Sequence, residues 1–449
     1  MKKIGIVIYS YTFGYANYPI NVALALEHEG YEVHVFLDTA TYERGKITFE
    51  GKHITIHPID VPRDNQSELA LPNEWQTFPR AWIASGVQRV LKLPQSPIRD
   101  VCVRSITFFQ RLFFERGNDT EKLRKQTATF MPDLFEFNEK LAPVIVEDDY
   151  TCLLGFGQNG LVAATMVALK CSPMRRPPVI YFSMELLPPT TAYSPSLSAV
   201  KSLERICSQL CYFVVIQDEA RGRRFIEATG VPKEKLVYVP ISGLRKAYRG
   251  RDNYFRELFD IKPEKKILLH AGVFLREMMC LEIAQAALNW GDDLVLILHS
   301  PVSAPVSEGG RDYLEKLKRT ADSDKVYLSL NPVEWQQVPQ MISSADIGLL
   351  FYDSNAPTFH EIGRSSNKLV QYLQAGLPLI ASDLPSLKRV MQDCRCGETT
   401  NHPNGIEGAA RKILSDYAAY RDRAFDCYEK EYHMSRYLGS VLEKISQIE

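Results

Sequence analysis

The sequence has 449 residues, enough for two or three domains with a large core. Its 53 Lys and Arg residues balance 54 Asp and Glu residues, which argues against a nucleic-acid partner. No apolar run approaches the roughly 18 residues that cross a membrane. The nine cysteines are scattered, and Cys394-x-Cys396 lacks a second pair to complete a zinc site. We therefore expect a cytoplasmic protein with reduced thiols and no metal.

The first residues predict a βαβ unit and hence a parallel sheet. Residues 4–9 form a short apolar run. Because Tyr and Asn follow it instead of a small-residue cleavage site, a first strand explains it better than a secretion signal does. A helix is predicted over about 19–29 and a second strand over 33–37. The loop between the first strand and the helix lacks G-x-G-x-x-G, the nicotinamide-type fingerprint.

Residues 68–125 interleave aromatic and basic side chains, for example Trp75, Arg80, Trp82 and Arg89. Two explanations remain open. The segment lies on an anionic membrane surface with its aromatic rings among the headgroups, or it packs on the sheet as helices with its arginines in water. The first explanation predicts binding to anionic vesicles that weakens when salt is added.

Polar side chains follow two predicted strands of the first half. Gln158 and Asn159 follow the strand at 151–156, and Glu185 follows the strand at 179–183. Open α/β sheets bind ligands at the carboxyl ends of their parallel strands, so all three are candidates to line a cleft. The alternative for Glu185 is a cap of the next segment.

The second half repeats the alternation of strands and helices. The polar, glycine-containing residues 242–253 are typical of a linker. Strands are predicted at 266–270, 294–299 and 326–330, and the last predicted helix covers about 434–448. Between them, residues 345–383 predict a strand, a polar loop, a helix and another strand.

The start of the helix within 345–383 has the features of an anion site. Ser365 or Ser366 offers an N-cap oxygen, and Asn367 adds a backbone N–H group at the same end. Lys368 in the first turn opposes the helix dipole, which favours anions there. A phosphate or diphosphate would satisfy both the lysine and the N–H groups. In the alternative, Lys368 points into solvent.

The segment S-S-N-K-L-V-Q-Y-L-Q-A-G-L-P-L-I-A-S resembles the donor site of GT-B glycosyltransferases, the large retaining group that uses nucleotide sugars. Many members read N-K-L-x-E-Y-L-x-A-G-x-P-V-I-A there. The resemblance implies an α/β protein with the GT-B fold, two Rossmann-like domains that face each other across a cleft. The acceptor domain would cover 1–242 and the donor domain 243–425, and a C-terminal helix at 426–449 would return to the first domain.

The resemblance also implies contacts with the donor. The diphosphate would lie at the helix start and beside a glycine and a basic residue after the first strand of the second domain. The nucleobase would lie against a loop before the helix that ends near residue 344. The residues implied for these contacts are Gly272, Arg276, Val333, Glu334, Ser365, Ser366, Asn367, Lys368 and Gln371. Gly14 and Tyr15 would face the cleft after the first strand, or form an ordinary tight turn.

The sequence departs from the family at two acidic positions. Gly363 and Gln371 stand where many members carry Glu, although Glu361 lies close to the first position and Gln371 can still bind ribose hydroxyls. The resemblance nevertheless implies a hexosyltransferase-like enzyme with Arg276, Lys368 and Glu361 as catalytic residues and no cofactor. It would move a sugar from a nucleotide sugar to a glycan or lipid-linked acceptor, with retention, in polysaccharide or glycoconjugate biosynthesis.

Two other functions stay open on the sequence alone. One is a nucleotide-sugar epimerase with the same fold. The other is a non-catalytic sugar-binding subunit that has lost its donor contacts, because of Gly363 and Gln371. If residues 68–125 do contact lipid, we expect a peripheral protein on the inner face of the membrane.

Overall fold

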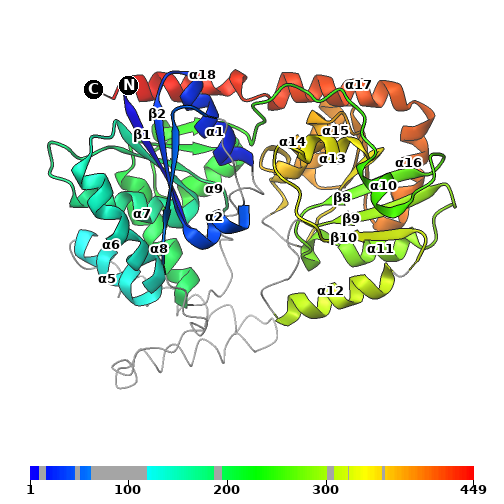
Figure 1. Cartoon of the computed structure of the whole chain (residues 1–449), viewed down its shortest axis with the longest axis horizontal. Helices are drawn as coiled ribbons and strands as arrows, with labels where there is room; N and C mark the ends of the chain where they lie inside the picture. Colours follow the sequence, from blue (N-terminus) through cyan, green and yellow to red (C-terminus); the bar gives the residue numbers. More distant parts are fainter. Residues whose placement is uncertain are drawn as a thin grey trace.

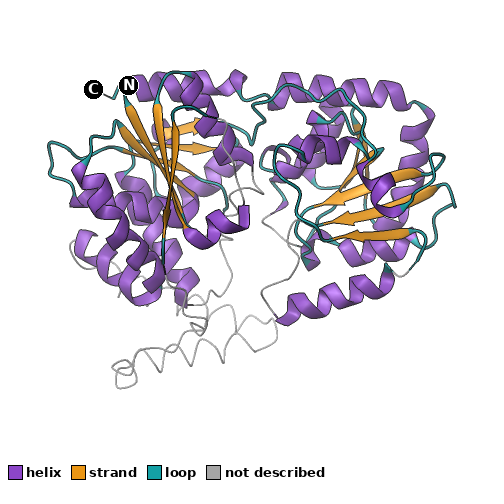
Figure 2. Cartoon of the chain, in the orientation of Figure 1, coloured by secondary structure: helices purple, strands orange, loops and turns teal. Residues whose placement is uncertain are grey.

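The computed structural model describes residues 1–9, 17–45, 51–61, 119–186, 195–300, 308–321, 323–355 and 359–448. These residues form two lobes, each with a sheet between layers of helices (Figures 1 and 2). All strand pairs in both sheets are parallel. Two α/β lobes with parallel sheets confirm the predicted fold class.

The described part of the first lobe contains a seven-stranded sheet in the order β3-β2-β1-β4-β5-β6-β7. The strands are β1 (Lys3–Ile8), β2 (Glu32–Asp38), β3 (Ile54–Ile59), β4 (Cys152–Phe156), β5 (Val179–Phe182), β6 (Phe213–Ile216) and β7 (Leu236–Tyr238). The helices are α1 (Asn17–His28), α2 (Thr39–Gly45), α5 (Asp119–Phe130), α6 (Pro132–Glu147), α7 (Gly157–Lys170), α8 (Pro195–Leu210) and α9 (Glu219–Thr229).

The second lobe has, within the described residues, a six-stranded sheet in the order β10-β9-β8-β11-β12-β13. The strands are β8 (Lys266–Ala271), β9 (Leu294–His299), β10 (Val326–Ser329), β11 (Ile347–Leu350), β12 (Leu379–Ser382) and β13 (Gly397–Thr400). The helices are α10 (Tyr254–Phe259), α11 (Cys280–Ala287), α12 (Glu308–Thr320), α13 (Val338–Ser343), α14 (Asn367–Gln374), α15 (Pro385–Cys394), α16 (Ile406–Ser415) and α17 (Tyr417–Cys427).

Both faces of each sheet are buried, which explains the continuous apolar runs of the strands. In β1, Ile6 packs into one core cluster and Val7 into another, on the opposite face. In β8, Leu268 and Leu269 alternate in the same way. One of these clusters continues from the first lobe into the second. The lobes are therefore joined by apolar packing as well as by chain connections.

The chain crosses between the lobes twice, and the crossings are bonded to each other. The first follows β7, and the second runs through the π-helix Tyr428–Tyr432 into α18 (Ser435–Ser446). Gly243 N donates to Tyr432 O at 2.9 Å, and Met434 N donates to Gly243 O at 2.8 Å. Helix α18 then lies along the first lobe, against β7 (Figure 1).

Cys394 and Cys427 form a disulfide, so the expectation of reduced thiols is wrong for this pair. Residues 68–118 of the basic-aromatic segment lie outside the described residues, and its last residues, 119–125, belong to α5. Among the helices that the structure describes, none is long and apolar enough to cross a membrane.

Candidate functional site

The site centres on Lys368, which extends from the first turn of α14 to the carboxyl end of β8. Lys368 is only 8% exposed, so it does not point into solvent. Its Nζ lies 3.2 Å from His270 Nε2 and 5.3 Å from the centroid of the Tyr352 ring. A Cβ atom at Gly272 would lie 3.2 Å from Lys368 Cε and 3.5 Å from Nζ. The lysine and the glycine after β8 are therefore neighbours.

Ser366 fixes the start of α14. Its Oγ accepts a hydrogen bond from Leu369 N at 3.2 Å, so Ser366, and not Ser365, is the N-cap. The Tyr352 hydroxyl at the end of β11 lies 3.3 Å from the same oxygen. The other N–H groups of the first turn have no partner within the helix, as at any helix start. They lie at the same end of α14 as the lysine.

Burial dominates the electrostatics of this cluster. It lowers the pKa of Lys368 to about 8, and Cys280 partly offsets the shift. The pKa of His270 is well below its ordinary value, first because the ring is buried and second because Lys368 is near. A neutral His270 accepts from the ammonium through Nε2, which places its own proton on Nδ1. In the described part of the chain, Nδ1 has no hydrogen-bond partner.

Lys368 has no carboxylate partner among the described residues: its polar contacts are His270 Nε2 and Met278 Sδ, the latter at 3.9 Å. Burying an isolated cation is costly unless an opposite charge compensates it. The cluster therefore favours binding of an anion beside Gly272.

Two arginines of α9 reach from the first lobe to the loop before α14. Arg221 is 2% exposed and donates to Ser365 Oγ at 3.1 Å and to Met184 O at 2.9 Å. Arg224 lies 3.6 Å from Glu361 Oε1. Ser365 and Glu361 thus lie at the junction of the lobes, and Glu361 faces a cation of the first lobe.

Glu185 belongs to the same junction. It is exposed, yet the surrounding protein desolvates its carboxylate and raises its pKa, while the Arg221 guanidinium partly offsets this. Gln158 Nε2 donates to the backbone oxygen of Glu185 at 2.6 Å, which joins the ends of β4 and β5. Asn159, the next residue, is half-buried. Gly14 and Tyr15 lie outside the described residues.

A small pocket lies between the lobes beside α14. Its water-accessible volume is only about 20 Å³, room for about one water molecule. Asn367 and Gln371 line it from α14, and Asn21 lines it from α1 of the first lobe. The guanidinium of Arg245, in the first crossing, lies 4.0 Å from the centroid of the Trp335 ring, which also lines the pocket. Gln371 therefore lies beside a small opening between the lobes.

The other expected donor residues are spread more widely. Arg276 is exposed in a single turn, Arg276–Met278, and its guanidinium lies 5.9 Å from the centroid of the Tyr313 ring of α12. Val333 is half-buried against the core, and Glu334 is exposed. Both precede Trp335 at the pocket.

The structure explains why Gly363 is not acidic. A Cβ atom at this position would lie 2.7 Å from the backbone oxygen of Ser386, a contact that real side chains do not make. Gly363 N also donates to Ser386 Oγ at 3.1 Å. The close approach of α15 excludes any larger residue here.

Sequence reasoning missed His270 and Arg221. His270 lies one residue before the end of an apolar strand, and the signal that could have found it is an ionisable residue two positions before a glycine at a strand end. Arg221 follows β6 in the run Gln217-Asp218-Glu219-Ala220-Arg221, which has the ordinary pattern of a helix start. Its role depends on Ser365, 144 residues away, so no local pattern marks it.

Several solved structures are similar to this chain over nearly its whole length. Sucrose-phosphate synthase from Thermosynechococcus elongatus matches with a TM-score of 0.67 and 12% identity over 100% of both chains. Anabaena Alr3699/HepE in complex with UDP-glucose matches at 0.61, with 15% identity over 99% of this chain and 100% of the other. The chain has the GT-B fold. A third GT-B match is an E. coli trehalose-6-phosphate structure bound with UDP-2-fluoro glucose, which has a TM-score of 0.62 and 11% identity over 99% of each chain.

No family model and no curated protein matches the sequence. The GT-B fold is therefore established by three-dimensional similarity across the full chain at low identity. Within this fold, the first lobe contributes Arg221 and Glu185 to the junction, and the second lobe contributes Ser365, Glu361 and Gln371.

Proposed function

We propose that this protein is a glycosyltransferase that takes a sugar from a nucleotide-diphosphate sugar. The observation that carries the proposal is a buried ammonium, Lys368, that has no carboxylate partner in the described chain and lies against Gly272 at the carboxyl end of β8. The GT-B fold supports it. Structures with this fold include one in complex with UDP-glucose and one with UDP-2-fluoro glucose.

Lys368 would act on the leaving group. When the bond between the sugar and the diphosphate breaks, negative charge grows on the departing phosphate oxygen. A cation that is already in place and shielded from water stabilises that charge more strongly than it stabilises the intact donor. The N–H groups at the start of α14 would add to this effect. Gln371, in the next turn of α14, would bind the ribose hydroxyls.

Calorimetric titration with a panel of nucleoside diphosphates and sugar nucleotides tests the donor site. We expect one nucleotide to bind, and Lys368→Met to weaken it at least tenfold, since a hydrogen bond to a charged group is worth roughly 1.5–3 kcal/mol. Lys388→Met is the matched control, because Lys388 is an exposed lysine of α15 paired with Asp383 at 3.1 Å. If no nucleotide binds, the non-catalytic alternative replaces the proposal.

Product analysis separates transfer from epimerisation. A transferase consumes its donor faster when an acceptor is added, and NMR of the new glycosidic bond should show the anomeric configuration of the donor, that is, retention. An epimer of the donor sugar that accumulates without acceptor would instead identify an epimerase.

The acceptor we propose is a glycan or a lipid-linked sugar, in polysaccharide or glycoconjugate biosynthesis in the cytoplasm. The basic and aromatic residues of 68–125 support contact with the inner face of a membrane. Flotation with anionic vesicles should recover the protein at low salt and lose it at high salt. Equal recovery with neutral vesicles would contradict this contact.

A further inference from the structure

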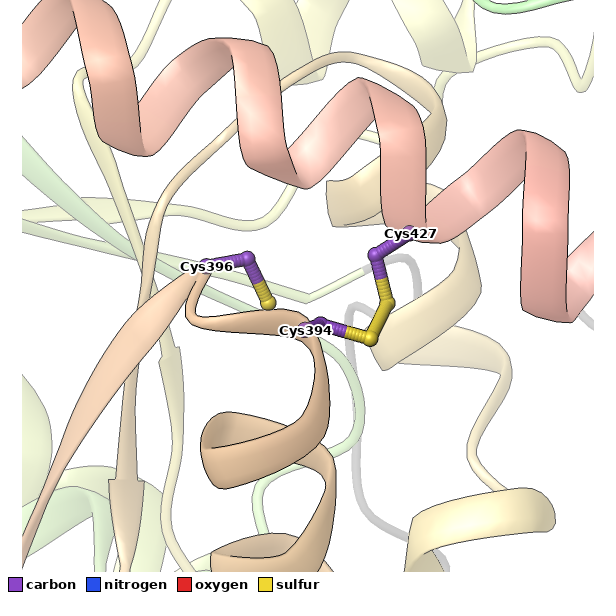
Figure 3. Close-up of side chains that lie close together, drawn as sticks. All are labelled: Cys394, Cys396 and Cys427. Atoms are coloured by element: carbon purple, nitrogen blue, oxygen red, sulfur yellow. A yellow bond between two sulfur atoms is a disulfide. The ribbon is translucent and has the colours of Figure 1, made fainter.

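Three cysteine side chains converge at the amino end of β13, whereas Gly272 lies at the carboxyl end of β8 in the same parallel sheet. The proposed sugar transfer uses none of these cysteines. Cys394 is the last residue of α15, Cys396 directly precedes β13, and Cys427 is the last residue of α17. Their sulfur atoms all lie within 4.8 Å of one another. Figure 3 shows the three side chains pointing toward one another from separate elements.

The disulfide between Cys394 and Cys427 uses only two of the three sulfur atoms. Cys396 is fully buried beside the pair, and burial raises the pKa of its thiol to about 12. The Arg423 guanidinium acts in the opposite direction and lowers that pKa; its Nε donates to Arg395 O at 2.6 Å. A positive charge therefore already lies near the sulfur atoms.

The backbone between the first two cysteines also has an unusual conformation. Arg395 has a φ of 53°, in the left-handed region that residues other than glycine rarely adopt. This turn ends α15 and starts β13, so the two cysteines that flank it come from a helix end and a strand start. Both sulfur atoms then face the end of α17.

We infer that Cys394, Cys396 and Cys427, once the disulfide is reduced, bind one soft cation of the zinc type. Thiolates are the ligands that Zn²⁺ and Cu⁺ prefer. Three protein ligands leave the fourth tetrahedral position of Zn²⁺ for water. Cys394 is half-buried while the other two are buried, so this position opens on the side of Cys394. The inference does not depend on the proposed sugar transfer.

Reduction of the disulfide requires only a phosphine and one water molecule. The phosphine gives two electrons to the Cys394–Cys427 disulfide, which breaks the S–S bond. The phosphine takes the oxygen of the water molecule and becomes a phosphine oxide, and the two protons of the water bind the two sulfur atoms to form two thiols. The three thiols then release up to three protons as the cation binds, because a metal deprotonates the thiols that coordinate it.

Cobalt titration of the full-length, phosphine-reduced protein under nitrogen tests the site. We expect one equivalent of Co²⁺ to produce sulfur-to-cobalt charge-transfer absorption in the near ultraviolet and the visible bands of a tetrahedral complex. One equivalent of Zn²⁺ should abolish both. Protons should be released in parallel, and the melting temperature should rise with metal concentration.

Cys396→Ser should weaken cobalt binding at least about tenfold, the lower limit even for outer partners of a metal site. Cys394→Ser, at the half-buried position, should do the same and covers the case that Cys396→Ser does not fold. The control is Cys171→Ser, a buried cysteine of the first lobe whose Sγ donates to Val167 O at 3.7 Å, a bond that serine can make.

Three results would overturn the inference. The first is no charge-transfer band although thiol titration shows that the disulfide is reduced. The second is unchanged cobalt affinity in both Cys396→Ser and Cys394→Ser. The third is an equal response from protein whose disulfide is intact, since binding would then involve other groups.

Discussion

Lys368 is a buried lysine whose nearest polar partner is a neutral histidine. Its pKa is about 8 against an ordinary 10.5, a difference worth about 3 kcal/mol at 1.36 kcal/mol per unit. Because the folded pKa is the lower one, the unfolded chain binds more protons between these values. The contribution of Lys368 to stability therefore rises with pH from about 8 to 10.5, and burial of the ammonium costs most below pH 8.

Donor binding should have the opposite pH dependence. Affinity for UDP-glucose, taken as a test donor with both phosphates fully ionised near neutrality, should be constant below the pKa of about 8 and should fall above it as Lys368 loses its proton. Calorimetry from pH 7 to pH 9 measures this. The Lys368→Met variant should bind UDP-glucose weakly at every pH. If its affinity falls by the same factor from pH 7 to pH 9, the titrating group is not Lys368.

Gly272→Ala should damage the same cluster through the backbone. Gly272 has a φ of 149°, and a Cβ atom there would lie 3.2 Å from Lys368 Cε. We expect a loss of about 1–3 kcal/mol in the free energy of unfolding and weaker nucleotide binding. Urea unfolding and calorimetry test this, with Gly439→Ala as the control, because a Cβ atom there meets nothing within 4 Å.

At the residue scale, the sequence identified candidate site residues but did not show which of them lie close together in the fold. The family resemblance indicated Lys368, in the segment 365–382, and Gly272, after the strand at 266–270. The fold makes these two residues neighbours although they are far apart in the chain. It did not indicate His270, because the role of a buried histidine depends on the lysine that packs on it. Whether Arg276 and Glu361 contact a donor stays a prediction: Arg276 lies by Tyr313, and Glu361 lies by Arg224.

At the scale of elements, periodicity located most strands well, because buried parallel strands are short continuous apolar runs. The expected strand at 4–9 corresponds to β1, Lys3–Ile8, and the helix at 19–29 corresponds to α1, Asn17–His28. Elements such as β13, Gly397–Thr400, were missed, because a polar edge strand lacks that pattern. Only packing against β12 makes it a strand.

Helix α8 contains a buried acid that should make stability depend on pH. Burial raises the pKa of Glu204 from 4.5 to about 7, although the Tyr181 hydroxyl donates to its Oε1 at 2.6 Å. The folded chain holds this proton more tightly than the unfolded chain does. The protein should therefore lose about 3 kcal/mol of stability through Glu204 as pH rises from about 4.5 to about 7, and no more above that.

Glu204→Gln should remove this dependence, since a neutral amide oxygen can still accept from Tyr181. From pH 5 to pH 8, the free energy of unfolding of Glu204→Gln, measured in urea, should fall less, or rise more, than that of the parent protein, by about 3 kcal/mol. Glu219→Gln serves as the control, because the Glu219 side chain is 72% exposed. Equal pH differences in the parent and in Glu204→Gln would contradict the assignment.

At the scale of the whole molecule, Arg221 is the side chain that ties the lobes most directly. It donates to Ser365 Oγ in the second lobe and to Met184 O in its own. Arg221→Met should cost about 2–3 kcal/mol, since each bond has a charged donor and both acceptors would lose their partner. It should also broaden the distribution of distances between the lobes in small-angle scattering.

Arg223 lies two residues from Arg221, and the variant Arg223→Met is the control for Arg221→Met. Arg223 lies on the same helix but is 69% exposed, and its ion pair with Glu219, at 4.0 Å, stays within α9. Surface pairs of this kind contribute little. A loss of stability in Arg223→Met as large as in Arg221→Met would show that the effect belongs to α9 itself and not to the junction.

The paired crossings at Gly243 and His433 have a mechanical consequence. Because backbone hydrogen bonds hold the two crossing segments side by side, one lobe can rotate relative to the other about an axis along these segments without breaking those bonds. Sliding one lobe past the other would pull the two segments apart and break the bonds. The structure thus favours a hinge with one axis over shear. A single nick in residues 246–253 would also leave the halves attached, because the second crossing and α18 remain in place.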